Sequence, residues 1–217
     1  MPKTEAFEKN QQKYDNWFKK NRNLYISELN AIKEILPDFD EAIEIGVGTG
    51  NYAAPLGIRF GIEPSENMAR IARSKGIEVT DAVAENIPFK DESFDLALMV
   101  TTLCFVDNPL KAFSETYRIL KSGGFFINAF VDKNSKIGKI YQKNKEKSIF
   151  YRSAIFYSTD EVVLLLEKAG FKNLVFRQTL FNTADKIKEP EKITEGYGEG
   201  SFIVIRAQKI PGLCFPV

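Results

Sequence analysis

The sequence predicts an α/β protein with a Rossmann-like, doubly wound sheet of seven strands and helices on both faces. We expect mostly parallel strands, with an antiparallel strand at the C-terminal end. Short apolar segments alternate with helical ones, as in sheets built from strand–helix–strand units. Residues 94–100 are almost all apolar, which is typical of a strand covered on both faces. The first predicted strand ends in a glycine-rich turn, a frequent ligand site in such sheets.

The chain has 217 residues, 44% of them hydrophobic, which is enough for one sizeable core. We therefore expect a single domain over residues 1–217. Its expected parts are an N-terminal helical extension or cap at 1–38, a ligand-binding core at 39–131, a lid at 132–157, and a C-terminal helix and strand hairpin at 158–210.

Two helices are expected before the core. In residues 5–20, Tyr14, Trp17 and Phe18 give a polar helix one aromatic edge. A second helix is expected from about Leu24 to Leu36, because the proline that follows disfavours helix in the residue before it.

Strands and helices then alternate. The expected strands are 41–45, 57–63, 77–83, 94–100, 125–130, 171–179 and 201–207. The expected helices are 51–56, one that begins after Ser65 as N-cap, 108–120, and one from the Ser158 cap to Ala169.

Composition excludes several kinds of chemistry. The chain has no histidine, so histidine-based nucleophilic machinery and histidine metal ligands are excluded. Cys104 and Cys214 have no partners at metal-ligand spacing, and we expect no metal site. With 30 basic and 29 acidic residues, we expect no nucleic-acid partner. The polar N-terminus and the lack of an apolar run of about 18 residues predict a cytoplasmic protein without a membrane span.

The glycine-rich turn reads Glu44-Ile45-Gly46-Val47-Gly48-Thr49-Gly50. Glycines after a strand permit a tight turn and close approach of a ligand to the backbone, although ordinary turns look similar. A dinucleotide fingerprint needs a further glycine where Asn51 stands, which argues against NAD.

Two later segments extend this pattern. Glu63 ends the second expected strand, where an acceptor-only carboxylate suits the vicinal hydroxyls of a ribose; otherwise it is a solvated acid. Residues 81–95 then offer backbone N–H groups and an apolar wall for an adenine, or are simply a loop before a strand.

In this order and spacing, the runs EIGVGTG, GIEPS, AENIPFKDESFDLALMVTTLCFV, ETYRIL and KSGG resemble the class I S-adenosylmethionine-dependent methyltransferases. They are most similar to the methyltransferase type 11 group, which includes ubiquinone/menaquinone-biosynthesis-like enzymes. The resemblance covers about residues 40–131. The segments Tyr14–Phe18 and Phe150-Tyr151 also resemble a bacterial and archaeal subgroup that acts on small molecules.

The resemblance implies S-adenosylmethionine as the cofactor and assigns its contacts. Glu44, Gly46, Val47 and Gly48 would hold the methionine part, Glu63 the ribose, Pro64 and Ser65 the flanks of the adenine, Ala84 and Glu85 its edge, and Thr101 and Thr102 would lie below the methionine part. Where many relatives carry an aspartate for the adenine amino group, this chain has Val83, so that contact is absent or comes from another group such as Glu85.

The expected reaction is in-line transfer of the methyl group to a small-molecule acceptor. Such a transfer needs positioning more than a dedicated catalytic group, although a base helps an amine or hydroxyl acceptor. The candidate bases are Tyr14, Asp107 and Tyr151, followed by Asp132, Tyr141 and Glu85. The alternatives are a protein or other macromolecule methyltransferase, a non-catalytic S-adenosylmethionine-binding module and, less favoured, an NAD-dependent oxidoreductase. The acceptor and the oligomeric state are not readable from the sequence.

Aromatic residues are expected to build the acceptor site. Tyr14, Trp17 and Tyr25 close over the cofactor, hold an apolar or cationic acceptor by ring contact, or simply pack a helix on the sheet. In residues 132–157, lysines interleaved with Ile137, Ile140, Tyr141, Ile149 and Phe150 predict an amphipathic lid with a solvated basic face. The apolar tail 210–217 is expected to pack on the sheet edge or on a partner chain.

Overall fold

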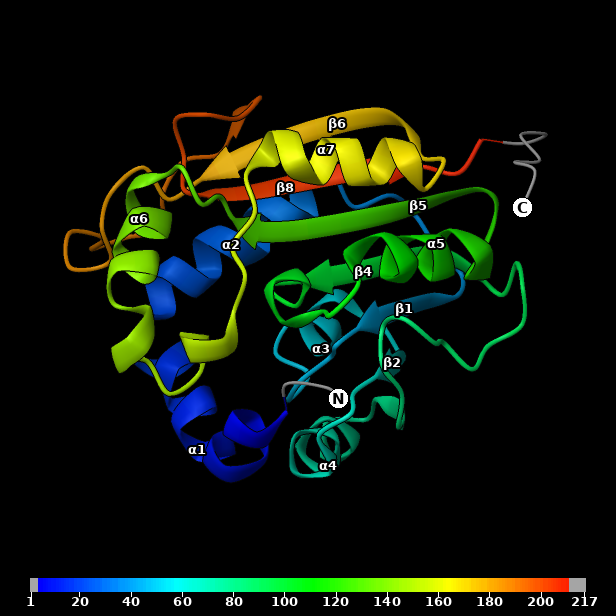
Figure 1. The fold of residues 1–217 in the computed structure, drawn as a ribbon, viewed down its shortest axis with the longest axis horizontal. Helices are drawn as coiled ribbons and strands as arrows, with labels where there is room; N and C mark the ends of the chain where they lie inside the picture. The colour runs from blue at the N-terminus through cyan, green and yellow to red at the C-terminus, as the bar shows by residue number, and fades with distance from the viewer. Residues whose placement is uncertain (1–3, 211–217) are drawn as a thin grey trace.

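The computed structural model describes residues 4–210, and within them the strands form one eight-stranded sheet (Figure 1). The strands are β1 (Ala42–Ile45), β2 (Phe60–Ile62), β3 (Glu78–Thr80), β4 (Phe94–Val100), β5 (Leu120–Val131), β6 (Lys172–Thr179), β7 (Thr194–Glu195) and β8 (Phe202–Gln208). Cys214 and most of the apolar tail lie outside the described residues.

The strand order is β3-β2-β1-β4-β5-β8-β6-β7. Strands β1 to β5 pair in parallel, whereas β8 is antiparallel to both β5 and β6. The chain runs outward from β1 to β3 and returns to β4 on the other side of β1, so the carboxyl ends of β1 and β4 form the switch point where such sheets bind ligands. The predicted sheet is confirmed. The additional strand β7 has two residues, too few to show a periodicity.

The helices follow the predicted segments closely. They are α1 (Glu5–Lys20), α2 (Arg22–Glu34), α3 (Ala53–Leu56), α4 (Glu66–Ser74), α5 (Pro109–Ile119), α6 (Lys136–Lys143) and α7 (Thr159–Lys168), with single 3-10 turns η1 (Leu103–Phe105), η2 (Lys145–Lys147) and η3 (Tyr151–Ser153). Both predicted caps are confirmed: Ser65 accepts a hydrogen bond from the Met68 N–H, and Ser158 and Glu161 form a reciprocal capping box.

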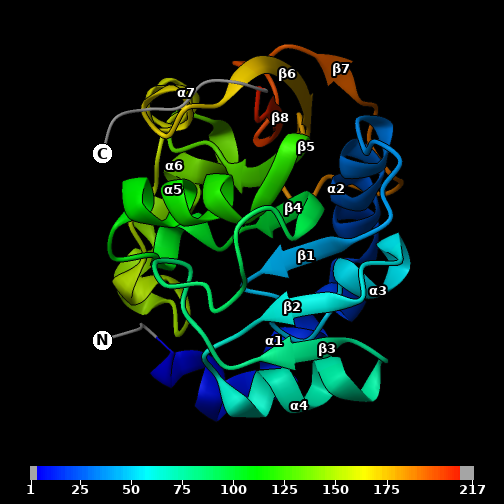
Figure 2. The ribbon, with the colours of Figure 1, turned by 90° about the vertical axis from the view of Figure 1, so that its right-hand side faces the viewer.

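The helices cover the sheet on both faces (Figure 2). On one face, α5 and α7 pack Phe113 and Leu166 against the sheet. On the other face, α2 and α3 pack residues such as Ile32 against Leu96 and Leu98. Alternate residues of β4 enter opposite cores, because successive strand residues point to opposite faces.

The arrowheads of β1, β4 and β5 point toward α1 and the lid segment that contains α6 (Figure 1). In the lid, Ile137 is buried and the Tyr141 ring faces inward, as an amphipathic segment requires. The expectation for the other two isoleucines was wrong: Ile140 is 42% exposed and Ile149 46% exposed. No helix within residues 4–210 is both long enough and apolar enough to cross a membrane.

Candidate functional site

A pocket of about 500 Å³ opens at the carboxyl ends of β1, β2 and β4 and reaches beneath α1 and the lid. This volume is ordinary for a site that binds a small molecule or cofactor. Of the eleven residues predicted to hold the cofactor, eight line it: Gly46, Gly48, Glu63, Pro64, Ala84, Glu85, Thr101 and Thr102. The topology thus brings together motifs that are separate in the sequence.

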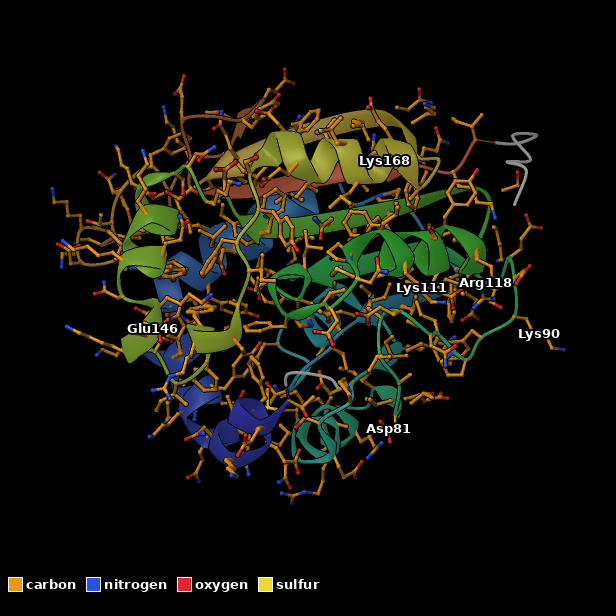
Figure 3. All side chains as sticks on the ribbon, in the orientation of Figure 1. Asp81, Lys90, Lys111, Arg118, Glu146 and Lys168 are labelled. Atoms are coloured by element: carbon orange, nitrogen blue, oxygen red, sulfur yellow. The ribbon has the colours of Figure 1, made fainter. Side chains whose placement is uncertain are left out.

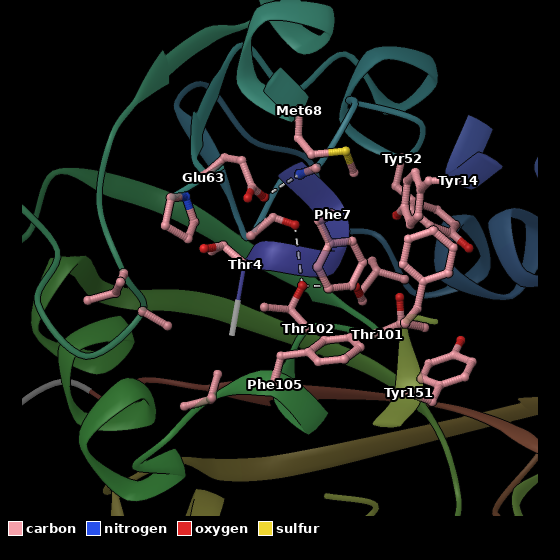
Figure 4. Close-up of a pocket in the computed structure, with 18 of the residues that line it drawn as sticks. Thr4, Phe7, Tyr14, Tyr52, Glu63, Met68, Thr101, Thr102, Phe105 and Tyr151 are labelled. Carbon is pink, nitrogen blue, oxygen red and sulfur yellow. Dashed lines mark hydrogen bonds between the residues drawn. The ribbon is translucent and has the colours of Figure 1, made fainter. Parts of the chain in front are cut away.

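The glycine loop needs its glycines. Gly46 and Gly48 have φ values of +73° and +55°, a region that residues with a Cβ atom rarely adopt. A Cβ atom on Gly46 would lie 2.4 Å from the Thr102 Cγ2 atom, so a side chain here would displace the loop after β4. The Thr102 hydroxyl donates to the Gly46 carbonyl at 3.3 Å and joins the two loops (Figure 4).

Glu63 is held by backbone donors at the end of β2. One carboxylate oxygen accepts a hydrogen bond from the Gly48 N–H at 2.9 Å (Figure 4). The other accepts from the Ser65 N–H, also at 2.9 Å. Burial raises the pKa of this carboxyl group to about 7, and the two N–H donors act in the opposite direction. Each oxygen has a further lone pair, so the group retains acceptor capacity toward the pocket.

Three of the predicted cofactor residues do not line the pocket. Val47 packs against Gly61 in the core, where a Cβ atom on that glycine would lie 2.7 Å from the valine side chain. Ser65 is 1% exposed and caps α4, and its hydroxyl donates to Glu8 at 2.5 Å. Glu44 is a buried residue of β1, the strand that leads into the glycine loop.

The Glu44 carboxyl group is 1% exposed, and burial raises its pKa well above the ordinary value. The Ala53 N–H donates to the group and lowers the pKa in part. Its Oε2 atom is buried and has no hydrogen-bond partner among residues 4–210. A buried acceptor without a donor is costly, so this atom is suited to a donor that the protein itself does not supply.

The loop after β3 forms another wall of the pocket, through residues 82–85. Glu85 accepts hydrogen bonds from the Asp107 and Asn108 N–H groups, at 2.8 and 3.0 Å, through its Oε1 atom. That oxygen therefore fixes the start of α5, and only the second oxygen of Glu85 is left to compensate for Val83. Thr101, directly after β4, has a φ of +50°, a rare conformation for a β-branched residue and one that is often found at functional sites.

Aromatic side chains build the rest of the pocket. Phe7 of α1 contacts Phe105 of η1 and Phe150 of the lid, with ring centroids 4.9 and 5.2 Å apart. Tyr141 stacks on Tyr151 within the lid at 4.9 Å. The predicted aromatic edge of α1 is confirmed as part of the same wall, which contains Tyr14, Trp17 and Phe18. Figure 4 shows Phe7, Tyr14, Tyr52 and Tyr151 gathered on one side of the pocket.

The candidate bases separate into two groups. Tyr14, Asp107, Tyr151, Tyr141 and Glu85 all line the pocket. Burial raises the pKa of Tyr14, Tyr141 and Tyr151 above the ordinary value, so none of these hydroxyls is a good base at neutral pH.

Asp132 is not a base candidate, contrary to the sequence prediction. Its Oδ2 atom accepts hydrogen bonds from the N–H and the hydroxyl of Thr159, both at 2.7 Å, and fixes the start of α7. Asp132 lies 27 residues before Thr159 in the sequence, so no local sequence pattern indicates this role. Tyr25 does not line the pocket either. Its hydroxyl donates to the Asn51 carbonyl at 2.5 Å.

The sequence prediction missed Glu28, which lines the pocket from α2 and is 3% exposed. The Tyr52 hydroxyl donates to it at 2.5 Å, and burial raises the pKa of the carboxyl group to about 8. A signal was available: Leu24 and Ile32 lie one turn before and after Glu28, which puts an acid on the apolar face of the helix. Such an acid is buried and needs a specific partner.

Comparison with known proteins agrees with this geometry. A family model described as a methyltransferase domain matches residues 43–128. The chain is 52% identical to a Thermotoga maritima protein of known structure, described as a SAM-dependent methyltransferase and possible histamine N-methyltransferase. The match covers 94% of this chain and 98% of that one, with a TM-score of 0.92.

Two further relatives extend the comparison. An uncharacterized protein of Methanocaldococcus jannaschii is 45% identical over 205 residues, which is 94% of this chain and 99% of the relative. A ubiquinone/menaquinone biosynthesis C-methyltransferase of Campylobacter jejuni is 29% identical over 146 residues, 57% of this chain and 62% of that enzyme. The strand order, the glycine loop and these relatives together show that the chain belongs to the class I S-adenosylmethionine-dependent methyltransferases of the type 11 group. Its cofactor is therefore S-adenosylmethionine.

Proposed function

We propose that the protein transfers the methyl group of S-adenosylmethionine to a small-molecule acceptor in the aromatic part of the pocket. One observation carries the proposal: α1 and the lid both contribute to the pocket wall, so the space beyond the glycine loop is roofed. A roofed pocket with aromatic walls suits a small molecule better than a side chain on a folded protein. In this proposal residues 1–217 act as one domain, with 1–38 and 132–157 as its roof.

The residues at the carboxyl ends of the strands fit the cofactor. In the proposal, Glu63 accepts hydrogen bonds from the ribose hydroxyls with its remaining lone pairs. The unpartnered oxygen of Glu44 is a natural acceptor for the amino group of the methionine part. The backbone at Gly46 and Gly48, together with Thr101 and Thr102, forms the surface next to that part, and Pro64, Ala84 and Glu85 bound the adenine.

When bound, the cofactor supplies a methyl group activated by a sulfonium sulfur. The residues of the chain then have to hold the acceptor in line with that group and exclude water. The aromatic side chains of α1, η1 and the lid suit the second task. The descriptions of two relatives, a possible histamine N-methyltransferase and a ubiquinone/menaquinone biosynthesis C-methyltransferase, both name small-molecule chemistry and support the choice of acceptor class.

The test uses S-adenosylmethionine labelled in its methyl group. The purified protein is incubated with two fractions of a cell extract, one of small metabolites and one of proteins and RNA. We expect label in the metabolite fraction, and its loss with the Glu63→Ala variant. Label in the macromolecular fraction alone would instead establish a macromolecule methyltransferase. Tight binding of S-adenosylhomocysteine without transfer to either fraction would favour a non-catalytic binding module.

A further inference from the structure

Glu28 is a buried carboxylate in the pocket that the cofactor motifs do not include. It belongs to α2, whereas the glycine loop, Glu63 and Thr101 follow strands of the sheet. Five tyrosine hydroxyls lie within the field of its charge, those of Tyr14, Tyr25, Tyr52, Tyr141 and Tyr151. Burial is the main cause that raises the pKa of each of these tyrosines, and the negative charge of Glu28 adds to it.

No basic side chain neutralises Glu28 within residues 4–210. No salt bridge there includes it, and the two lysines that line the pocket, Lys13 and Lys111, are exposed. Tyr52 is the hydrogen-bond donor found for it, and burial dominates its raised pKa. A buried carboxylate without a cation is costly, and this cost raises the pKa of Glu28 to about 8, so the group is mostly protonated at neutral pH. A bound ammonium ion would replace that proton as the neutralising charge.

The surrounding side chains are suited to a cation. Trp17, Phe18 and Phe150 line the pocket with Tyr141 and Tyr151. Aromatic faces attract ammonium groups, and sites for such groups are built from several aromatic rings. An anionic acceptor would instead find no positive partner in Glu28 and Glu63, two buried carboxyl groups of the pocket wall that repel an anion when they ionise.

We propose, on the basis of the methyl-transfer function above, that the acceptor is a small amine, bound as its ammonium ion by Glu28 and the aromatic side chains of α1 and the lid. Glu28 releases its own proton to solvent as the ammonium ion binds, and the resulting carboxylate then takes one proton from the ammonium group and leaves a neutral amine. The amine lone pair then forms the new N–C bond while the S–CH₃ bond breaks, and the electron pair of that bond stays on sulfur. The positive charge passes from sulfur to nitrogen, and the methylated ammonium later releases its extra proton to solvent.

Five tyrosines from several elements lie close enough to this carboxyl group for its charge to act on them. Tyr14 comes from α1, Tyr25 from α2 itself, Tyr52 from the turn before α3, Tyr141 from α6 and Tyr151 from η3. Glu44 of β1 also acts on Tyr14 and Tyr25. Two cations also act on these groups, Arg22 on Tyr25 and Lys75 on Glu44, but neither forms a salt bridge with Glu28 within residues 4–210, so an ammonium ion would be the one cation paired with that carboxyl group.

The Glu28–Tyr52 hydrogen bond also has a purely structural explanation, because it holds α2 against the start of α3. The Glu28→Gln variant separates the two roles. A glutamine carbonyl still accepts from the Tyr52 hydroxyl, but it has no charge for an ammonium ion and cannot take its proton. Glu146→Gln is the matched control, because Glu146 is an exposed acid on the outer side of the lid (Figure 3).

The experiment measures binding to the protein saturated with S-adenosylhomocysteine. The probes are primary amines of increasing size, from alkylamines to arylethylamines, each with the alcohol and the carboxylate of the same carbon skeleton. We expect calorimetric binding of at least one amine and much weaker binding of its alcohol and carboxylate. In Glu28→Gln the amine affinity should fall about 10- to 100-fold, the loss typical of a charge-assisted hydrogen bond, with S-adenosylhomocysteine binding unchanged. Glu146→Gln should behave like the wild type.

Three results would overturn the inference: equal binding of alcohols and amines, amine binding that survives Glu28→Gln, or no binding by any amine of the series. None of these touches the proposed function, which fails only if label reaches no small metabolite. Methylation of an alcohol or a carbon acceptor would agree with that function but would exclude an amine as the acceptor.

Discussion

The Asp15 carboxylate of α1 accepts a hydrogen bond from the buried hydroxyl of Thr49, with 2.6 Å between the two oxygens. The same Asp15 oxygen accepts from the Asn51 side chain at 3.1 Å. One turn from the start of α1, Glu8 accepts from the Ser65 hydroxyl and the Asn67 N–H. The N-terminal helix is therefore fastened to both turns that flank the pocket, after β1 and after β2, and its position and the shape of the glycine loop depend on each other.

Replacing Asp15 with alanine should loosen α1 from the glycine loop and weaken cofactor binding. We expect the affinity for S-adenosylhomocysteine to fall about 5- to 50-fold, because one buried hydroxyl loses its acceptor and the roof becomes more mobile. Calorimetric titration measures this. Asp38→Ala, an exposed acid before β1, should leave the affinity unchanged. An affinity equal to that of the wild type in Asp15→Ala would mean that α1 does not help to hold the cofactor.

Glu63→Gln should weaken cofactor binding more than its small change in shape suggests. Both oxygens of Glu63 accept from backbone N–H groups, whereas a glutamine has one oxygen and one NH₂ group. One N–H then faces a donor, and the ribose hydroxyls lose a charged acceptor. We expect a loss of about 10- to 100-fold in the affinity for S-adenosylmethionine and S-adenosylhomocysteine.

The control for this variant is Glu66→Gln, an exposed neighbour in an exposed ion pair with Arg73. It should change neither affinity, because exposed pairs contribute little. Titration with NAD should show no binding in any variant. Binding of NAD by the wild type, or normal cofactor affinity in Glu63→Gln, would contradict the assigned role of this carboxylate.

Arg118 holds the loop after β3, which forms one wall of the pocket. Its guanidinium group donates to the Ile87 and Phe89 carbonyls, both at 2.8 Å, and pairs with Glu115, which in turn accepts from the Ile87 N–H. We expect Arg118→Ala to lower the free energy of unfolding by about 1–3 kcal/mol, measured by urea denaturation.

Arg118→Lys tests the reason for this effect. A lysine keeps the charge but not the planar fork that reaches two carbonyls and a carboxylate together. It should recover only part of the lost stability. Full recovery would show that charge rather than geometry fixes the loop.

Local patterns in the sequence predicted most of the fold. The strand that precedes Gly46, the Ser65 cap and the Ser158 capping box each depend on neighbouring residues, so a short window of sequence contains them. The pocket wall was harder to predict. Val47 and Ser65 lie within cofactor motifs, but one side chain enters the core and the other caps a helix. Motif membership alone does not say which way a side chain points.

Glu28 illustrates what a sequence without a structure leaves open. The sequence prediction missed its burial, although the apolar face of α2 indicates it, and no sequence pattern indicates which residues surround it. Tyr141 and Tyr151 come from the lid, far away in the sequence, and only the closure of the lid over the carboxyl ends of the strands places them near α2. Within the lid itself, the amphipathic pattern misplaced Ile140 and Ile149, which face solvent.

The burial of Glu28 should also appear in the dependence of stability on pH. In the folded protein the pKa of Glu28 is about 8, against an ordinary value of 4.5. The stability that the protonated group supports is complete below about pH 4.5 and is lost as the pH rises through 8. Glu28→Gln cannot ionise, so it should match the wild type near pH 5 and exceed it by up to about 4 kcal/mol near pH 9.

Urea denaturation of both proteins at a series of pH values from 5 to about 9 checks this expectation. The Glu146→Gln variant, which alters an exposed acid, should follow the wild type throughout. A constant difference between Glu28→Gln and the wild type would mean that Glu28 is already ionised in the folded protein at pH 5. If the wild type loses stability at high pH as expected, saturation with an amine that binds should supply the missing cation and reduce this loss, because a ligand that binds only the folded state stabilises it.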